Sequence, residues 1–176
     1  MRKKLLLGTI AAIVPILGIA GYAAADGGQS SLAELRQATA KYHDVAVALA
    51  EPNAVELPQV PPFGTGTCIA NLSGDGAMGI HILLQDRVDD QLVPTEPEAI
   101  LYERRNDGTY KLTGVEYIVA SAERPTLYGQ QFDETNLARY GNPAATVWTL
   151  HVWAWKPNPD PSRGIFNPWN TRVSCD

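Results

Sequence analysis

Apolar side chains recur at helical spacing between residues 31 and 51. Ser31 followed by Glu34 forms a capping box, which is a start signal of helices. Pro52 ends the pattern. The sequence therefore predicts one amphipathic helix in which His43 borders the buried face. The apolar positions at intervals of three and four residues are Leu32, Leu35, Ala38, Tyr42, Val45 and Leu49.

Two later regions have patterns typical of β-strands. Residues 78–84 are apolar around His81 and predict a short buried strand. Residues 100–104 and 110–120 flank an Asp-Gly turn, which supplies the positive φ that tight β-hairpins need. These patterns predict one buried strand followed by a β-hairpin.

Residues 146–155 are apolar on both faces, which predicts a central strand covered on one side by the helix. With a period of two, His151, Trp153 and Trp155 share one face of this strand. Loops rich in proline or glycine occupy the intervals 52–68, 121–145 and 156–161. The predicted fold is α+β: one N-terminal helix packed on a mostly antiparallel sheet of four or more strands.

The first 25 residues have the pattern of a signal peptide. Arg2, Lys3 and Lys4 precede an apolar stretch over residues 5–21, and three alanines at 23–25 suit signal peptidase. We therefore expect residues 26–176 to be a single domain that is secreted or periplasmic, without a membrane span. An uncleaved anchor is the alternative, because the apolar stretch approaches the length of a spanning helix.

The balance of charge restricts the class of partner. The chain has 14 basic and 19 acidic residues, and loss of the three basic residues of the signal leaves a net charge of −8. Nucleic-acid binding is excluded because it needs clustered Lys and Arg, and attachment to anionic membranes is disfavoured for the same reason. Small molecules, metal ions and extracytoplasmic proteins remain as partners.

The two cysteines, Cys68 and Cys175, predict a disulfide that ties the tail to the first third of the domain. A redox-active pair usually has Cys-x-x-Cys spacing, which is absent here. The predicted disulfide is therefore structural.

The only three histidines, His43, His81 and His151, all lie in apolar segments rather than in polar runs. Imidazole is the commonest metal ligand, and three imidazoles with a water or carboxylate satisfy a zinc or copper site. Glu116 joins the set because an unpaired carboxylate inside Val-Glu-Tyr-Ile-Val would be costly to bury. Glu103, on the paired arm of the hairpin, has a weaker claim. The alternatives are separately bonded histidines and a Glu116 that faces solvent from an edge strand.

Two tryptophans, Trp153 and Trp155, could form a stacking platform for a sugar or ring together with Trp169 and Tyr128. Core packing is the favoured interpretation, because tryptophan is usually largely buried. The sequence has no Gly-x-Ser-x-Gly elbow and no glycine-rich phosphate loop.

Five segments carry a recognisable pattern that spans most of the chain from the predicted helix to Cys175. They are Thr-Ala-Lys-Tyr-His-Asp (39–44), Ala-Met-Gly-Ile-His (77–81), Ile-Leu-Tyr-Glu (100–103), Gly-Val-Glu-Tyr (114–117) and Leu-His-Val-Trp-Ala-Trp-Lys-Pro-Asn-Pro (150–159). The chain resembles a family of exported bacterial proteins of unknown function. The resemblance implies a shared site that includes all three histidines and the Glu of Val-Glu-Tyr, and it also implies a late cysteine. This chain departs from the family at three places: the turn at 160–163 is longer, Thr171 stands where proline is expected, and Ile82 stands where an aromatic residue is common.

Two hypotheses of function follow. The first is an exported domain that binds a metal ion or small molecule at His43, His81, His151 and Glu116, with a metal-bound water for hydrolysis as an extension. The alternative is a noncatalytic secreted or envelope interaction module that binds a protein or glycan through its acidic loops and tryptophans. The sequence assigns no reaction.

Overall fold

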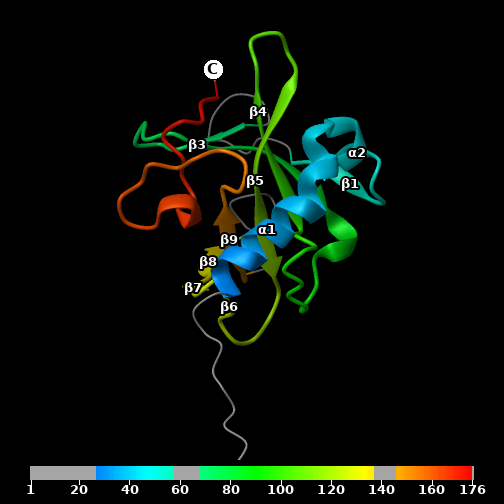
Figure 1. The fold of residues 1–176 in the computed structure, drawn as a ribbon, viewed down its shortest axis with the longest axis vertical. Coiled ribbons are helices and arrows are strands. Elements are labelled where there is room, and N and C mark those ends of the chain that lie inside the picture. Colours follow the sequence, from blue (N-terminus) through cyan, green and yellow to red (C-terminus); the bar gives the residue numbers. More distant parts are fainter. Residues whose placement is uncertain (1–26, 58–67, 137–145, 176) are drawn as a thin grey trace, which may run out of the picture.

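The computed structural model describes residues 27–57, 68–136 and 146–175 (Figure 1). The predicted signal peptide, residues 1–25, lies outside these segments. Among the helices in the described segments, none combines the length and hydropathy that crossing a bilayer requires.

The predicted N-terminal helix is present as α1 and packs on the sheet, but the helical region is broken at Asp44, so it is not continuous over residues 31–51. Asp44 is extended, with φ −91° and ψ 111°, and its carboxylate accepts a hydrogen bond from the Ala46 N–H at 3.0 Å. The hydroxyl of Tyr102, from the sheet, donates to the Tyr42 carbonyl at 2.7 Å immediately before the break. The chain thus starts a second helix at an aspartate cap. The three pieces are α1 (Gly27–Thr39), the 3₁₀ turn η1 (Ala40–His43) and α2 (Val45–Leu49).

The sheet contains seven strands in the described part of the chain, ordered β1-β3-β4-β5-β9-β8, with β2 also paired to β3. Every neighbouring pair is antiparallel, which confirms the predicted α+β class. The strands are β1 (Ala54–Glu56), β2 (Cys68–Ala70), β3 (Ala77–Leu84), β4 (Ala99–Arg104), β5 (Tyr110–Val119), β8 (Asp133–Asn136) and β9 (Thr146–Val152). Outside the sheet lie the short pair β6 (Thr126–Leu127) and β7 (Gln130–Gln131) and the 3₁₀ turns η2 (Gln85–Arg87) and η4 (Gly164–Phe166).

The predicted hairpin is confirmed as β4 and β5, and the predicted buried strand as β3. The sheet also contains β8, which was not predicted. It lies inside the interval 121–145 that was expected to be a loop. Its sequence, Asp-Glu-Thr-Asn, is polar and gives no hydrophobic signal.

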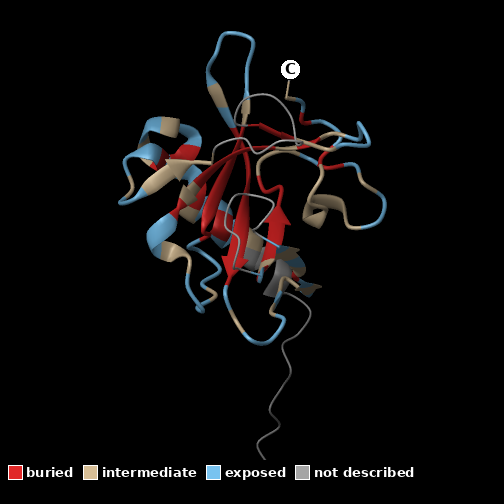
Figure 2. Ribbon diagram, turned by 180° about the vertical axis from the view of Figure 1, so that it is seen from behind, coloured by how far each residue is buried: buried red, intermediate tan, exposed pale blue. Residues whose placement is uncertain are grey.

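The helical segment and the sheet enclose the main core. Figure 1 shows α1 crossing one face of the strands, and Figure 2 shows from behind that the central strands are buried. Leu35 of α1 and Tyr42 of η1 are fully buried against apolar side chains of the sheet. A smaller apolar cluster, made by Ala99, Ile118 and Val147, forms a second core.

The C-terminal tail is fastened back onto the sheet. Cys68 and Cys175 form the predicted disulfide, which joins β2 to the end of the tail. Asn170 exchanges two backbone hydrogen bonds with Ala77, at 3.1 and 3.2 Å. The tail therefore closes one end of the molecule against β2 and β3.

Candidate metal centre

Three strands each contribute one buried side chain that can bind a metal, on the sheet face opposite the helices. His81 lies on β3, Glu116 on β5 and His151 on β9. Each is flanked in sequence by two residues of the main core, and side chains alternate along a strand, so all three point away from that core. The flanking residues are Ile80 and Ile82, Val115 and Tyr117, and Leu150 and Val152.

The strand register brings the three side chains together. Glu116 pairs directly with His151 across β5 and β9. On its other side Glu116 pairs with Ala99 of β4, while His81 pairs with Leu101 of the same strand. The short side chain of Ala99 lets the Glu116 carboxylate extend over β4 toward His81.

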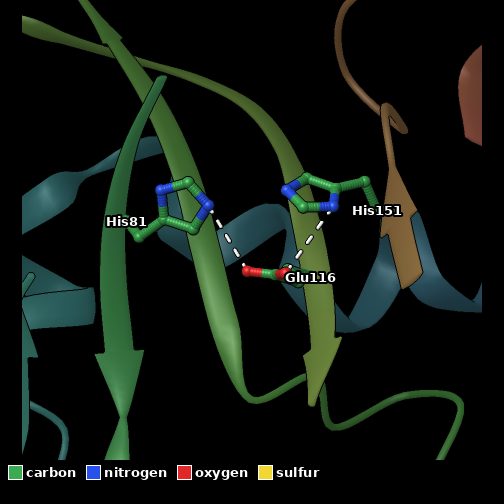
Figure 3. A group of neighbouring side chains, drawn as sticks. All are labelled: His81, Glu116 and His151. Carbon is green, nitrogen blue, oxygen red and sulfur yellow. Dashed lines mark ion pairs between the residues drawn. The ribbon is translucent and has the colours of Figure 1, made fainter. Parts of the chain in front are cut away.

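The resulting distances define a compact triangle of donor atoms (Figure 3). His81 Nε2 lies 3.3 Å from Glu116 Oε2, and His151 Nδ1 lies 3.6 Å from Glu116 Oε1. The two imidazole rings are perpendicular, with centroids 5.8 Å apart. One donor atom from each residue lies within 4.8 Å of the other two, which makes this cluster able to hold a metal ion.

All three side chains are removed from solvent: the exposed fractions of His81, Glu116 and His151 are 2%, 7% and 3%. Burial alone would raise the pKa of Glu116, but the nearby His151 and His81 and a hydrogen bond from Thr149 hold it below its ordinary value. Burial lowers the pKa of His151, and this outweighs the opposing effect of Glu116. Glu116 is therefore the ionised group of the site at neutral pH.

A short relay of hydroxyl groups supports the carboxylate. Thr149, two residues before His151 on the same face of β9, bonds through its hydroxyl to Glu116. Thr135 of β8 lies with its Oγ1 2.8 Å from that of Thr149. Because an ionised carboxylate only accepts, Thr149 donates to Glu116 and accepts from Thr135. The relay fixes one side of Glu116 from the edge of the sheet.

Two ring nitrogens in the cluster lack a hydrogen-bond partner among the residues that the structure describes, His81 Nδ1 and His151 Nε2. Buried polar atoms are nearly always bonded, so these two distinguish the cluster from an ordinary satisfied core network. Figure 3 shows His151 Nε2 on the side of its ring that faces His81. One imidazole binds one ion through a single nitrogen, so His151 Nε2 is an alternative to Nδ1 as the donor atom of this residue.

A cavity of about 280 Å³ adjoins the cluster and is lined by all three of its residues. Asp133 and Thr135 of β8 contribute to its wall, as does Ile118 of the second core. The cluster is therefore buried from bulk solvent but accessible to a small molecule in the cavity.

His43 does not join the cluster, so its assignment to a four-residue site is wrong. It ends η1, on the side of the sheet that carries the main core, and its side chain is exposed. Its ring packs edge-on against Trp155, with centroids 4.4 Å apart. The break at Asp44 ends the helical stripe on which its inward orientation depended.

Trp153 and Trp155 do not share one strand face, so they do not form the stacking platform that the sequence offered as a possibility. Core packing, the favoured interpretation, describes Trp153. The strand ends at Val152, where the Ala154 N–H bonds back to the Val152 carbonyl in a tight turn, so strand alternation stops there. Trp153 is 1% exposed, and its indole N–H donates to a tail carbonyl. Trp155 is half-buried and donates its indole N–H to Thr39 on the helical side.

Sequence reasoning missed Thr149, Thr135 and Asp133 as neighbours of the cluster. Thr149 could have been found, because it shares a face with His151 two residues away in an apolar strand. Thr135 and Asp133 could not have been found, because they lie in a short polar segment whose sequence does not indicate a strand.

The fold and the cluster together define an α+β domain with a buried His-Glu-His centre next to a small cavity. Comparison of the chain with protein-family models, curated proteins and solved structures gave no significant match. The function of the protein is therefore inferred from the geometry of the centre.

Proposed function

We propose that this protein binds one transition-metal ion, zinc or copper, through His81, Glu116 and His151, with the cavity as the approach for a small molecule. The observation that supports it best is the spacing of the donor atoms. Ligands about 2.0–2.1 Å from a tetrahedral metal lie about 3.3 Å from one another. The two separations to Glu116, 3.3 Å from His81 Nε2 to Oε2 and 3.6 Å from His151 Nδ1 to Oε1, are close to this value, and all three donor atoms lie within 4.8 Å of one another.

The 3.6 Å separation between His151 Nδ1 and Glu116 Oε1 is long for a hydrogen bond between nitrogen and a carboxylate, which is usually about 2.7–3.2 Å. The 3.3 Å contact of His81 is close to that range, and it lowers the pKa of Glu116 as a hydrogen bond. The spacing therefore favours an ion over a direct hydrogen bond between His151 and Glu116.

The charge of the cluster points the same way. Among the described residues, the ion-pair partners of Glu116 are the two histidines and include no Lys or Arg. Burying a carboxylate without a full positive charge is costly. A divalent cation supplies that charge, and two imidazoles with one carboxylate are a donor set that zinc uses when a coordination position is left for water or substrate.

When bound, such an ion supplies Lewis acidity to a molecule in the cavity. The chain's own contribution is to hold Glu116 in place through Thr149 and to shield the centre from bulk solvent. This leaves hydrolysis as an extension of the proposal.

Export is part of the proposal. The disulfide fits an extracytoplasmic protein, because such bonds persist in oxidising compartments. The signal-like first 25 residues and the resemblance to a family of exported bacterial proteins support secretion or a periplasmic location, and both stay predictions.

The alternative, an interaction module built on exposed tryptophans, has no specific observation in its favour. In the described segments Trp153 is buried and the other three tryptophans are partly buried. The exposed large apolar side chains there are Leu49, Leu72 and Val93.

The test is metal analysis of protein produced with its disulfide formed and without a histidine tag. After removal of metal and exposure to excess zinc or copper, we expect about one equivalent to remain through gel filtration. H81A, H151A and the isosteric E116Q should each lose it, while H43A, an exposed histidine outside the cluster, should keep it. Circular dichroism and the free-thiol content establish that each variant is folded.

Failure to retain zinc or copper after reconstitution would refute the proposal. So would retention of a full equivalent by folded H81A, H151A and E116Q alike, since the ion would then lie elsewhere.

A further inference from the structure

The cavity beside the centre is sorted into an apolar half and a polar half across the sheet. The sheet order places β1, β2 and β3 on one side of β4 and β5, and β9 and β8 on the other. Most of the apolar lining lies on or beside the first group of strands, and its residues are Leu57, Ile69, Met78 and Leu83. Three further apolar residues come from outside this group: Ile118 of β5, Val88 after η2, and Pro168 of the tail. The polar wall follows the second group, and its residues are Asp133, Thr135 and Thr149. The metal centre lies between them.

The apolar wall continues directly from a metal ligand. Leu83 lies two residues after His81 on the same face of β3 and is half-buried. Ile69 pairs with Gly79 across β2 and β3, which extends the wall toward the edge of the sheet. A ligand that fills this side of the cavity therefore buries hydrocarbon against hydrocarbon.

The polar wall is already satisfied by the protein. The hydroxyls of Thr135 and Thr149 are committed to the relay that ends on Glu116. Asp133 is paired with Arg163 of the tail, with an Nη1–Oδ2 distance of 2.5 Å. Because these groups already have partners, the polar part of a ligand would bind at the metal centre rather than at the polar wall.

The volume bounds the size of the ligand. A cavity of about 150 Å³ lined by apolar side chains holds benzene. The cavity here, about 280 Å³, has room for one ring or a short hydrocarbon chain together with one head group. A polymer or a dinucleotide would not fit inside it.

We propose that the cavity binds a compact molecule that has an apolar body, about one six-membered ring in size, and a single head group whose oxygen atoms coordinate the metal. The body lies against Leu83 and Ile69, and the head group lies at His81, Glu116 and His151. This inference rests on the proposed metal site and adds the class of ligand and its orientation.

The test compares two probes that share a metal-binding head. Benzohydroxamate has the ring and acetohydroxamate has a methyl group in its place. On zinc-loaded protein, titration calorimetry should show benzohydroxamate binding at least about ten-fold tighter, because the ring buries apolar area that the methyl group lacks. Removal of zinc should weaken the binding of both probes at least about ten-fold.

A matched pair of variants locates the ring. L83Q replaces a cavity-wall leucine by a polar side chain of similar size and should reduce the preference for benzohydroxamate to within about three-fold. L72Q makes the same change at an exposed position outside the cavity wall and should leave the preference intact. Both variants should retain one equivalent of zinc.

The outcomes separate the two proposals. Protein that holds one zinc but binds both hydroxamates equally would overturn the ligand class and leave the metal site standing. An unchanged preference in L83Q would overturn the orientation. Protein that retains neither zinc nor copper would overturn the metal site and the ligand class together.

Discussion

Glu98 is a buried carboxyl whose ionisation should make the stability of the protein fall as pH rises. It directly precedes β4, is 2% exposed, and its Oε2 accepts a hydrogen bond from the Ile118 N–H at 2.8 Å. Burial raises the pKa of Glu98 from 4.5 to about 8, and Asp89 acts in the same direction. The Ile118 N–H and Arg87 oppose this rise without cancelling it. The folded protein therefore keeps Glu98 protonated at neutral pH.

The sign and size of the effect follow from proton linkage. Between pH 4.5 and about 8 the folded state binds this proton more tightly than the unfolded state does. The free energy of unfolding consequently decreases across this window, and it is highest below pH 4.5 as far as this group is concerned. Integration from pH 5.5 to pH 8 gives a loss of about 3 kcal/mol from Glu98 alone.

The assay is urea unfolding followed by tryptophan fluorescence at pH 5.5 and pH 8, with the disulfide intact. E98Q keeps an acceptor for the Ile118 N–H and cannot ionise, so its pH-dependent loss of stability should be about 3 kcal/mol smaller than that of the wild type. His151, whose pKa is lowered, contributes a change of opposite sign below pH 6.5, but it does so in both proteins and cancels from the difference. E96Q, at an exposed position nearby, should behave like the wild type. Equal pH dependence in wild type and E98Q would refute the reasoning.

Three further outcomes test the fold. Replacing Cys68 and Cys175 together by serine opens a loop of 107 residues and should lower the free energy of unfolding in urea by up to about 4–5 kcal/mol. G79A should cost at least about 2 kcal/mol in the same assay, because Gly79 has φ +84° and a Cβ there would overlap the carbonyl oxygen of Tyr102. W153F should cost about 2 kcal/mol, since it leaves a void in the core and an unpaired tail carbonyl; a thermal unfolding midpoint equal to that of the wild type would contradict this.

The parts of the fold that could be predicted were those in which local pattern and tertiary structure agree. β3 and the β4–β5 hairpin were found because apolar runs are bounded there by turn residues. The disulfide was found because a chain that is predicted to be exported and has two cysteines offers a single pairing.

The parts that could not be predicted depend on contacts between distant residues. The helical pattern through residues 31–51 shows no break, and the interruption depends in part on the bond from Tyr102 to the carbonyl of Tyr42, 60 residues away in sequence. β8 was missed because an edge strand needs backbone partners rather than apolar side chains, and its partner β9 supplies them. Neither feature leaves a local signature.

The candidate site shows the same division. His81, Glu116 and His151 each interrupt an apolar run, and they converge because β3, β5 and β9 lie close together in one sheet. His43 was included because it lies in an apolar segment, because helical periodicity places it at the border of the buried face, and because the family resemblance implies it. A residue at the border of a helical stripe has solvent available to it, and the structure leaves His43 exposed.

There is a physical reason why the candidate residues on interior strands belong to the cluster and the candidate residue on the helical segment does not. A strand buried on both faces offers no water to a polar side chain, so the side chain must be bound by another group of the protein or by a ligand. Three such residues on near-neighbouring strands then satisfy one another only in part: the carboxylate has the hydroxyl relay and two histidines, while one nitrogen of each ring has no partner within the described segments. An ion held by His81 Nε2, Glu116 and His151 Nδ1 would place the buried charge of Glu116 beside a cation, and it would leave the other nitrogen of each ring as it is. The case for an ion therefore depends on the buried carboxylate, whose ion-pair partners among the described residues include no Lys or Arg.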